Sequence, residues 1–546
     1  MRGKTIRDVF CDSASKYCSR KAISLIDSQT YTYLELYQRV LETSGKLSQI
    51  NLQKGDKIAL LSGNCPNWCI SYLAIIHIGA VVVPILPDFT GKEVQNILEH
   101  SESKALIIAE NLRSKVNFEE LNFIETVVNI EDFSLQTKIN QNITTNNATK
   151  INELCEIDEN DLASIIYTSG TTGTSKGVML THKNIVWNIF ATEKIQDMLP
   201  EDRLLSVLPL SHAYECTLGF LMPLFYGASI YYLGGLPTAS VLIPAMQKVK
   251  PTMMLTVPLI IEKIYKSKIK PELTKGIVGF LYKLMPIRKI LNKVAGKKLI
   301  KTFGGEIRFF GIGGAMLDSE TEQFLHEAGF PYAIGYGLTE TSPLIAGANP
   351  QKTKIGSTGF SSPDQQLKLI NINPLTGKGE IVAKGNHVMA GYYKNDELTQ
   401  SVFTPDGWFK TGDLGYFDKK NRLFIKGRLK NMILGANGEN IYPEEIEAIL
   451  GRHNLVRDAI VYQLKGKLVA KVNLDYDEIE KRYNLLKEHA RNMQSDLEQY
   501  ITYILNEIHL YVNSEVNSFS KLAKLIEHPV PFEKTPTLKI KKYLYV

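Results

Sequence analysis

The chain of 546 residues is poor in cysteine, and its six cysteines are scattered without a C-x-x-C pair: Cys11, Cys18, Cys65, Cys69, Cys155 and Cys216. No histidine cluster accompanies them. Structural zinc sites and disulfide frameworks both need closely spaced sets of ligands or cysteines. We therefore expect neither of them in this protein.

The chain also lacks a strong excess of one charge, since its formal net charge is +6 and charged residues make up 22% of the sequence. No regular alternation of basic and aromatic residues is present, so we do not expect a nucleic-acid partner. The first residues lack the apolar core of a signal peptide, and a cytoplasmic location is expected. The most apolar stretch, residues 204–235, is interrupted by Pro209, His212 and Glu215. This pattern favours a buried core segment over a membrane span.

Short apolar runs alternate with helical patterns in the first part of the chain. The runs "KIALLS" and "AVVVPILP" flank a helical stretch, and "ALIIA" follows a second one at "GKEVQNILEH". Such alternation predicts an α/β fold with doubly wound parallel sheets. The length of the chain indicates at least two domains. The character of the sequence changes at "GRLKN", so we predict a large N-terminal domain over residues 1–427 and a small C-terminal domain over residues 428–546.

Residues 263–301 form a basic segment in which Glu272 is the only acidic residue and apolar residues are interleaved with lysines. Two interpretations stay open. The segment is a solvated helical face, or it makes a peripheral contact with anionic lipid headgroups at the inner membrane face.

A loop rich in glycine and hydroxyl groups, residues 168–177, lies between the apolar runs "ASIIY" and "GVML". Glycine lets backbone N–H groups approach an anion, and Lys176 adds a mobile positive charge. The spacing differs from that of the nucleotide loop G-x-x-x-x-G-K-[ST], because Ser175 stands at the position of the second glycine and Gly177 follows the lysine. The loop is either a polyphosphate-binding turn or a hairpin connection, and Thr181 is the expected N-cap of the next helix.

Further motifs follow in a specific order: "GIGGAML", "GYGLTETSP", "GWFKTGDLG", "GRLKNMILGANGENIYPEEIE" and "KTPTLKIKK". With these motifs the sequence resembles the adenylate-forming superfamily of acyl-CoA synthetases, aryl-CoA ligases, luciferases and adenylation domains. The resemblance covers nearly the whole chain and is greatest to the long-chain fatty acid–CoA ligase branch. It implies a large domain of doubly wound sheets, a small mobile α+β domain, and ATP, Mg²⁺ and CoA as cofactors.

The resemblance assigns roles to individual residues. Glu340 is expected to coordinate magnesium, Tyr336 to stack on adenine, and Asp413 to accept hydrogen bonds from the ribose with Arg428 beside it. His212 is expected near the substrate carboxylate, although a hydrogen-bonded core histidine fits the sequence nearly as well. The expected nucleotide-binding residues are Thr168, Ser169, Gly170, Thr171, Thr172, Gly173, Thr174, Lys176, Gly313, Gly314, Ala315, Tyr336, Gly337, Thr339, Asp413 and Arg428.

Four residues near the C-terminal part are expected to serve the two half-reactions of the family. Lys539 would bridge the carboxylate and the α-phosphate, with Thr339 on the same phosphate. Lys430 would be the hinge of a domain rotation. Gly435 and Gly438 would then leave room for the pantetheine arm of CoA. In this sequence Leu538 and Lys542 stand where many relatives have glycine and arginine, and Asn431 replaces a common acidic residue.

The resemblance implies an ATP-dependent synthetase that activates a long-chain fatty acid as acyl-AMP and transfers it to CoA. Three other functions are weighed against it. The first keeps the adenylation step but transfers the acyl group to acyl carrier protein. The second is a catalytically silent lipid-binding protein, and the third is a phosphotransferase, which the loop spacing disfavours.

Overall fold

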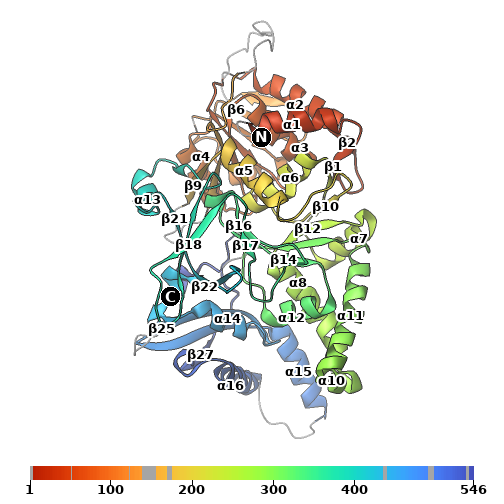
Figure 1. The fold of residues 1–546 in the computed structure, drawn as a ribbon, viewed down its shortest axis with the longest axis vertical. Coiled ribbons are helices and arrows are strands. Elements are labelled where there is room, and N and C mark those ends of the chain that lie inside the picture. The colour runs from red at the N-terminus through yellow and green to blue at the C-terminus, as the bar shows by residue number, and fades with distance from the viewer. Residues whose placement is uncertain are drawn as a thin grey trace.

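The computed structural model describes residues 4–50, 52–121, 123–137, 155–168, 175–235, 237–434, 440–489, 497–535 and 540–546. Two large sheets flanked by helices occupy the upper and middle right of Figure 1, and antiparallel strands fill the centre. The last segments of the chain lie at the bottom. The model therefore confirms the expected α/β class.

The eight-stranded sheet has the order β20-β9-β8-β4-β3-β5-β6-β7. Its strands are β3 Lys57–Leu61, β4 Val81–Ile85, β5 Ala105–Ile108, β6 Thr126–Asn129, β7 Leu135–Thr137, β8 Leu162–Thr168, β9 Lys176–Thr181 and β20 Gly391–Tyr392. The strands from β8 to β6 pair in parallel, whereas β7, β9 and β20 pair antiparallel to their neighbours. Helices α3 (Pro66–His77) and α4 (Gly91–Ser101) connect the parallel strands where the apolar pattern predicts helices.

Local capping explains where several of these helices begin. The Thr90 side chain accepts from the Glu93 N–H at the start of α4, and the Glu93 carboxylate accepts from the Thr90 N–H. Thr181 caps α5 (His182–Glu193) in the same reciprocal way with Asn184. The expected N-cap at Thr181 is thereby confirmed.

The seven-stranded sheet has the order β14-β13-β12-β10-β11-β1-β2 and is parallel except for β2. Its strands are β1 Lys21–Leu25, β2 Thr30–Thr32, β10 Arg203–Ser206, β11 Ser229–Tyr232, β12 Met253–Thr256, β13 Phe309–Ile312 and β14 Tyr332–Ile334. The helices around it are α1 Ile6–Lys16, α2 Tyr33–Leu47, α6 Met222–Tyr226, α7 Ala239–Val249 and α12 Ser319–Ala328.

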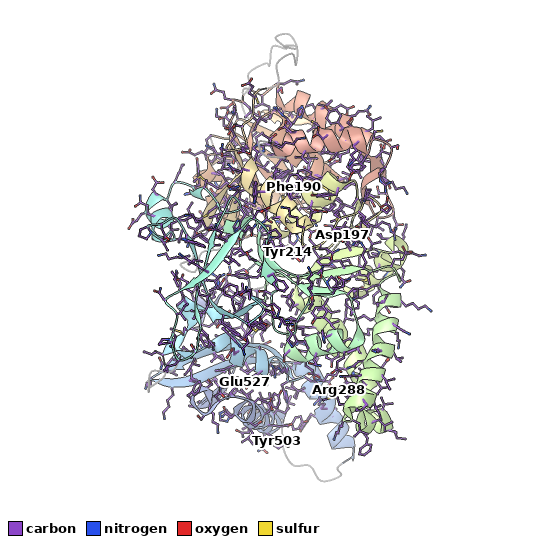
Figure 2. All side chains as sticks on the ribbon, in the orientation of Figure 1. Phe190, Asp197, Tyr214, Arg288, Tyr503 and Glu527 are labelled. Carbon is purple, nitrogen blue, oxygen red and sulfur yellow. The ribbon has the colours of Figure 1, made fainter. Side chains whose placement is uncertain are left out.

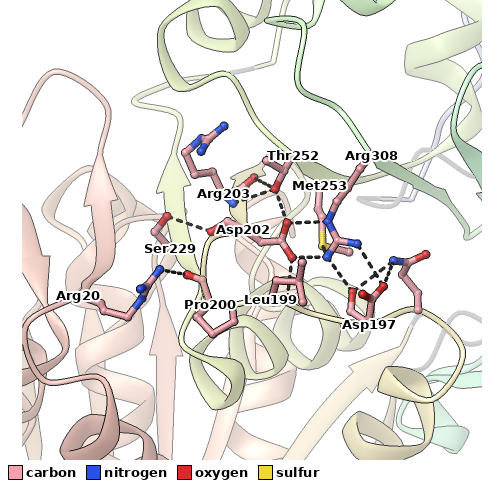
Figure 3. Close-up of polar contacts among 11 residues, drawn as sticks. Arg20, Asp197, Leu199, Pro200, Asp202, Arg203, Ser229, Thr252, Met253 and Arg308 are labelled. Atoms are coloured by element: carbon pink, nitrogen blue, oxygen red, sulfur yellow. Dashed lines mark hydrogen bonds and ion pairs between the residues drawn. The ribbon is translucent and has the colours of Figure 1, made fainter.

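A buried carboxylate ties together the amino ends of three strands of this sheet (Figure 3). Asp202, just before β10, accepts from the Thr252 hydroxyl at 2.6 Å and from Arg308 Nε at 2.8 Å. Thr252 precedes β12 and Arg308 precedes β13. Because this network braces the amino edge of the sheet, the opposite carboxyl edge is left for ligands.

Antiparallel strands follow in two smaller sheets at the centre of the molecule. One contains β15 Tyr336–Gly337, β16 Leu344–Gly347 and β17 Phe360–Ser361, and the other contains β18 Gln366–Ile370, β19 Gly379–Lys384, β21 Phe409–Phe417 and β22 Leu423–Arg428. The helix α13 (Asp396–Ser401) precedes β21.

Residues 204–235 form a buried segment, as predicted. They comprise β10, a π-helix over Glu215–Leu221, α6 and β11, and the π-helix is buried along its whole length. Glu215 is only 1% exposed. No helix in the part of the chain that the structure describes is both long and apolar enough to cross a membrane.

The basic segment is helical and lies at the lower right of Figure 1. It comprises α8 Pro258–Ile264, a π-turn over Tyr265–Ile269, α9 Lys270–Thr274, α10 Gly276–Tyr282 and α11 Met285–Thr302. Arg288, labelled in Figure 2, joins α11 to α12 through both oxygens of Glu327.

The C-terminal segment packs around its own core of apolar side chains. Its elements are β23 Ile433–Leu434, β24 Asn440–Ile441, α14 Pro443–Leu450, β25 Val456–Leu464, β26 Lys467–Leu474, α15 Tyr476–His489, α16 Leu497–Glu515 and β27 Lys524–Glu527. A separate apolar core is what a separately folding unit requires.

Candidate functional site

Several of the expected site residues lie at or just after the ends of strands. Gly335 N–H donates to the Ile312 carbonyl at 2.9 Å, so the chain leaves β13 and β14 at the same edge. Gly313 and Tyr336 follow at that edge. Ligands of open α/β sheets bind outside the carboxyl ends of parallel strands.

A buried carboxylate pairs with a tyrosine and an arginine from three different strands. Asp413 on β21 accepts from Tyr336 Oη at 2.7 Å and pairs with Arg428 Nε at 2.9 Å. Asp413 and Arg428 are cross-strand neighbours in register on β21 and β22. Asp413 is 4% exposed, whereas the Arg428 side chain is 48% exposed. The structure thus brings together the three residues that are expected around the nucleoside.

A second polar group surrounds Glu340 on the short 3₁₀ turn Thr339–Thr341. Tyr392 on β20 donates its hydroxyl to Glu340 Oε1 at 2.8 Å, and Lys176 Nζ lies 5.4 Å from the centre of the Tyr392 ring. Tyr392 is 4% exposed, and burial beside Glu340 raises its pKa well above the usual range. The carboxylate is therefore held by a neutral hydroxyl donor.

The positively charged side chains of Lys176 and Lys430 lie near each other at this site. Burial lowers the pKa of Lys176, the nearby Lys430 lowers it further, and Glu340 opposes them. Arg428 also lies within electrostatic range of Glu340. An anionic ligand would relieve the repulsion between Lys176 and Lys430, as expected for a site that receives a polyphosphate.

Three hydrogen bonds to its carbonyls and to that of Leu344 hold the Glu340 turn in place. The Met389 N–H donates to the Glu340 carbonyl at 2.9 Å. On α5, Asn188 Nδ2 donates to the carbonyls of Thr341 and Leu344. Helix α5 and the segment before β20 thereby fix a turn that is far from both in sequence.

Glycine is required at Gly337, and a larger residue at Gly313 would crowd a neighbouring ring. A Cβ at Gly337 would lie 1.9 Å from the Pro343 carbonyl oxygen. A Cβ at Gly313 would lie 3.1 Å from the ring of Tyr214, which Figure 2 places near the middle of the molecule. Gly314 adopts φ +84, so the expected thin wall at Gly313, Gly314 and Ala315 is also a left-handed turn.

His212 lies next to Tyr214, the residue that contacts Gly313. Its Nδ1 accepts from the Tyr214 N–H at 3.3 Å, and its carbonyl accepts from the Cys216 N–H at 2.9 Å. The assignment of His212 to the substrate carboxylate stays a prediction.

Several expected residues lie outside the described part of the chain: Ser169, Gly170, Thr171, Thr172, Gly173, Thr174, Gly435, Gly438 and Lys539. Their flanks are described. Thr168 and Lys176 pair in register on β8 and β9. Lys541 lies 3.7 Å from Glu93 at the start of α4, and Lys542 pairs with Glu447 at 2.8 Å.

Tyr392 was not predicted from the sequence. It lies in "AGYYKND", which has no motif pointing to a polar site. Only the pairing of β20 with β9 brings it beside Lys176 and Glu340. Tyr214 and its contact with Gly313 were likewise outside the sequence predictions.

The α/β fold and this junction of sheets define a nucleotide-binding ligase of the adenylate-forming class. The family model described as AMP-binding enzyme matches residues 10–393, more than half of the chain, and the protein belongs to this family.

The relatives are distant but cover most of the chain. A long-chain-fatty-acid–CoA ligase of Mycobacterium bovis is 29% identical over 535 residues, covering 91% of this chain and 87% of its own length. A chloroplastic long-chain-fatty-acid–[acyl-carrier-protein] ligase of Arabidopsis thaliana is 28% identical, covering 84% of this chain and 74% of its own.

Solved structures support the same fold. The O-succinylbenzoate coenzyme A synthetase of Bacillus subtilis in complex with AMP superposes with a TM-score of 0.76 at 22% identity, covering 100% of this chain and 98% of its own. An anthranilate CoA ligase in complex with anthranoyl-AMP gives 0.78 at 18% identity, covering 99% and 96%. These likenesses confirm the predicted adenylate-forming fold.

The residues present fit ATP and Mg²⁺. Glu340 offers a carboxylate oxygen beside Lys176 and Tyr392, and Mg²⁺ commonly takes one or two carboxylates together with phosphate and water oxygens. Lys176 and Lys430 supply the complementary positive charge for a polyphosphate.

Proposed function

We propose that this protein is an ATP-dependent long-chain acyl-CoA synthetase. The observation that carries the proposal is the meeting of Tyr336, Asp413 and Arg428 with Glu340 and Lys176 where the sheets join. One group of residues suits a nucleoside, and the adjacent group suits its phosphates.

The reaction follows from the poor reactivity of a carboxylate. A carboxylate oxygen of the fatty acid attacks the α-phosphorus of ATP, the bond from that phosphorus to the bridging oxygen breaks, and pyrophosphate leaves. The thiol sulfur of the acceptor then attacks the acyl carbon, its proton is released, and AMP leaves with the oxygen that joined it to the acyl group. Both steps concentrate negative charge, so donors and cations fixed in advance lower the barrier.

Each part of the site has one task in this scheme. Asp413 accepts from the ribose hydroxyls while Arg428 pairs with its carboxylate, and Tyr336 presents its ring to the adenine. Lys176 and residues 168–174 bind the β- and γ-phosphates. Thr339 and Lys539 act on the α-phosphate, and Lys539 also binds the attacking carboxylate.

Glu340 would hold the magnesium ion, which neutralises phosphate charge when bound. Tyr392 orients Glu340 through its hydroxyl and is a positioning residue. Gly313, Gly314 and Ala315 leave room for the adenine and for the start of the acyl chain. His212 is assigned to the side of the site where the acyl carboxylate enters.

The C-terminal segment supplies the groups that differ between the two half-reactions. In our proposal, the part of the C-terminal segment that follows Lys430 rotates about it after adenylation, which withdraws Lys539. The rotation brings Gly435 and Gly438 toward the site of thiol attack. Polar contacts join this segment to the rest, such as Arg452 with Asp318 at 3.3 Å.

The name of the Mycobacterium bovis relative supports a long-chain fatty acid and CoA as substrates. The second candidate keeps the same adenylation and transfers the acyl group to acyl carrier protein, and the Arabidopsis thaliana relative favours it.

One assay tests the proposal. Purified protein is incubated with ATP, Mg²⁺ and carboxylic acids of increasing chain length, and products are measured with CoA, with holo acyl carrier protein and with neither. AMP and pyrophosphate with acyl-CoA are the expected products. Transfer to the carrier protein alone would support the second candidate. ADP and phosphate, or no turnover with any acid, would contradict adenylation.

A further inference from the structure

Helices α10 and α11 carry an unusual exposed surface at the lower right of Figure 1. Seven large apolar side chains within residues 277–294 are exposed on it: Ile277, Val278, Phe280, Leu284, Met285, Ile290 and Val294. Ile277 is 80% exposed and Phe280 is 71% exposed. Scattered exposed apolar residues need no explanation, but a cluster on two consecutive helices marks an interaction site. We call these residues and their neighbouring lysines the α10–α11 face.

The two sides of helix α11 differ in burial. On α11 the buried side chains are those of Asn292 and Leu299, with Gly296 between them. Ile290 and Val294 lie one turn apart on the outward side, and Lys297 continues the same row. The fold therefore buries one side of α11 and presents apolar and basic residues together on the other.

The lysines of this face have no acidic partner among the described residues. They are Lys283, Lys289, Lys293, Lys297 and Lys301, and all five are exposed. The acids nearby are already paired, since Glu272 binds Lys298 and Glu327 binds Arg288. The positive charge of the face is thus available to a partner.

We propose that the α10–α11 face docks on an anionic lipid bilayer, with the apolar side chains in the boundary between headgroups and acyl chains and the lysines against the headgroups. Charge complementarity selects this partner. A second copy of the chain meeting this face symmetrically would set lysine against lysine, which is unfavourable. Apolar residues beside unpaired lysines on short helices are the pattern of a segment that lies in the membrane interface.

This surface goes beyond the proposed function, because it concerns where the protein resides and needs neither ATP nor an acyl substrate. Sedimentation with vesicles tests it on the full chain without nucleotide. Binding to phosphatidylcholine vesicles containing a quarter of phosphatidylglycerol is compared with binding to phosphatidylcholine alone. We expect binding to the anionic vesicles that weakens with added salt, as screening requires.

Two variants divide the face into its charged and apolar parts. Lys293→Gln with Lys297→Gln should weaken binding to anionic vesicles about 25-fold, at roughly fivefold for each lysine. Phe280→Ser should weaken it about 10-fold through lost apolar burial. The matched controls are Lys465→Gln with Lys467→Gln, and Leu375→Asn, which change exposed residues of the same types elsewhere. The controls should bind as the unchanged protein does.

Other results would overturn the proposal. These are failure of the unchanged protein to bind anionic vesicles, equal binding to neutral vesicles, or equal weakening by the controls. Light scattering provides a further test without lipid. If light scattering shows that the unchanged protein is a dimer and that Ile290→Asn is a monomer, the face joins two copies of the chain instead. Adenylation measured on the same variants reports separately on the proposed function.

Discussion

The large region through Arg428 and the segment after it contribute to the candidate site in different ways. In the large region the polar groups are fixed by partners from neighbouring strands, as Asp413 is by Tyr336 and Arg428. The C-terminal segment meets the large region through scattered polar contacts, including Lys266 Nζ with the Gly451 carbonyl and Lys541 with Glu93. Each is a single contact, without the strand pairing that holds the polar groups of the large region.

In our proposal, one part holds the ligand and the other changes its position. A buried carboxylate that loses its partner costs about 3–5 kcal/mol, so the large region should resist rearrangement around Asp413. The contacts at the boundary are single polar contacts from separate segments.

The largest effect is expected from Lys539→Ala in the C-terminal segment. Because Lys539 is assigned to charge that develops during attack on the α-phosphorus, its loss should lower acyl-adenylate formation by about 10²–10³-fold. Thioester formation from supplied acyl-adenylate should change much less. Rapid quench measurements of each half-reaction check the split, and equal losses would contradict the assigned role. Lys541→Ala, two residues away, is the matched control and should keep most of the adenylation rate.

In the large region, Asp413→Asn removes the charge while keeping the shape of the side chain. Hydrogen bonds to a charged acceptor contribute about 1.5–3 kcal/mol, so two ribose contacts predict a fall in kcat/KM for ATP of about 100-fold. Pyrophosphate release measures it. Asp418→Asn, at the turn of the same hairpin, changes a half-buried pair with Arg422 that lies outside the proposed ribose contact, and it should leave kcat/KM within about twofold. A similar loss in both variants would mean that the hairpin, and not the ribose contact, is responsible.

The boundary between the parts is tested by Lys430→Pro. Lys430 lies in the 3₁₀ turn Leu429–Asn431, whose backbone angles are close to those that proline fixes. Proline should therefore permit the observed arrangement and resist a change at residue 430. We expect thioester formation to slow about 10-fold or more while adenylation is largely retained. Lys430→Ala removes the same charge without the restraint, and an identical loss in it would assign the effect to charge.

A smaller effect within the large region is expected from Tyr392→Phe. The variant removes the only hydroxyl that the structure shows on Glu340 Oε1 among the described residues. Removing the partner of a metal-binding carboxylate costs about 10-fold in metal affinity at the low end of such effects. The apparent KM for Mg²⁺ should rise by that factor, with a smaller change in KM for the fatty acid. Tyr393→Phe changes the neighbouring tyrosine as a control, and an unchanged Mg²⁺ dependence in Tyr392→Phe would remove its positioning role.

Many of the elements of the large region, and most of the residues that meet at the site, could be anticipated from the sequence. The alternation of apolar runs and helical patterns located β3, α3, β4, α4 and β5, because local periodicity reports which side of an element is buried. The motifs located Tyr336, Asp413, Arg428, Glu340 and Lys176, which the structure brings together. What each residue does there is still a prediction, and so are the domain limits.

The remaining features depend on pairings between distant segments. Tyr392 reaches Glu340 only because β20 joins the edge of the eight-stranded sheet, and two residues of strand leave no periodicity to detect. The basic segment had two open interpretations because the sequence could not show that Phe280 and Ile290 are exposed together with the lysines. Glu215 interrupts an apolar stretch in the sequence, and only the fold reveals that it stays buried.

Glu215→Gln tests how the large region tolerates that buried acid, and it should have the smallest effect. Burial raises the pKa of Glu215 to about 8, and no described partner binds its Oε2. The folded state thus keeps a proton that the unfolded state releases above its own pKa of about 4.5. Stability should therefore fall as pH rises toward 8 and level off above it.

Urea unfolding between pH 6.5 and 8 isolates this contribution. Burial lowers the pKa values of His77, His182 and His387 to about 4, whereas unfolded histidines titrate near 6.5 and add their own pH dependence. Both proteins contain these histidines, so their contribution cancels in the difference between the two stabilities. The stability of Glu215→Gln relative to the unchanged protein should grow by about 1–2 kcal/mol from the lower to the higher pH, since each pH unit corresponds to about 1.4 kcal/mol. Glu125→Gln, an exposed acid, should show no such trend. A constant difference would mean that Glu215 is ionised in the fold, and the large region would then hold a buried charge with a partner still to be found.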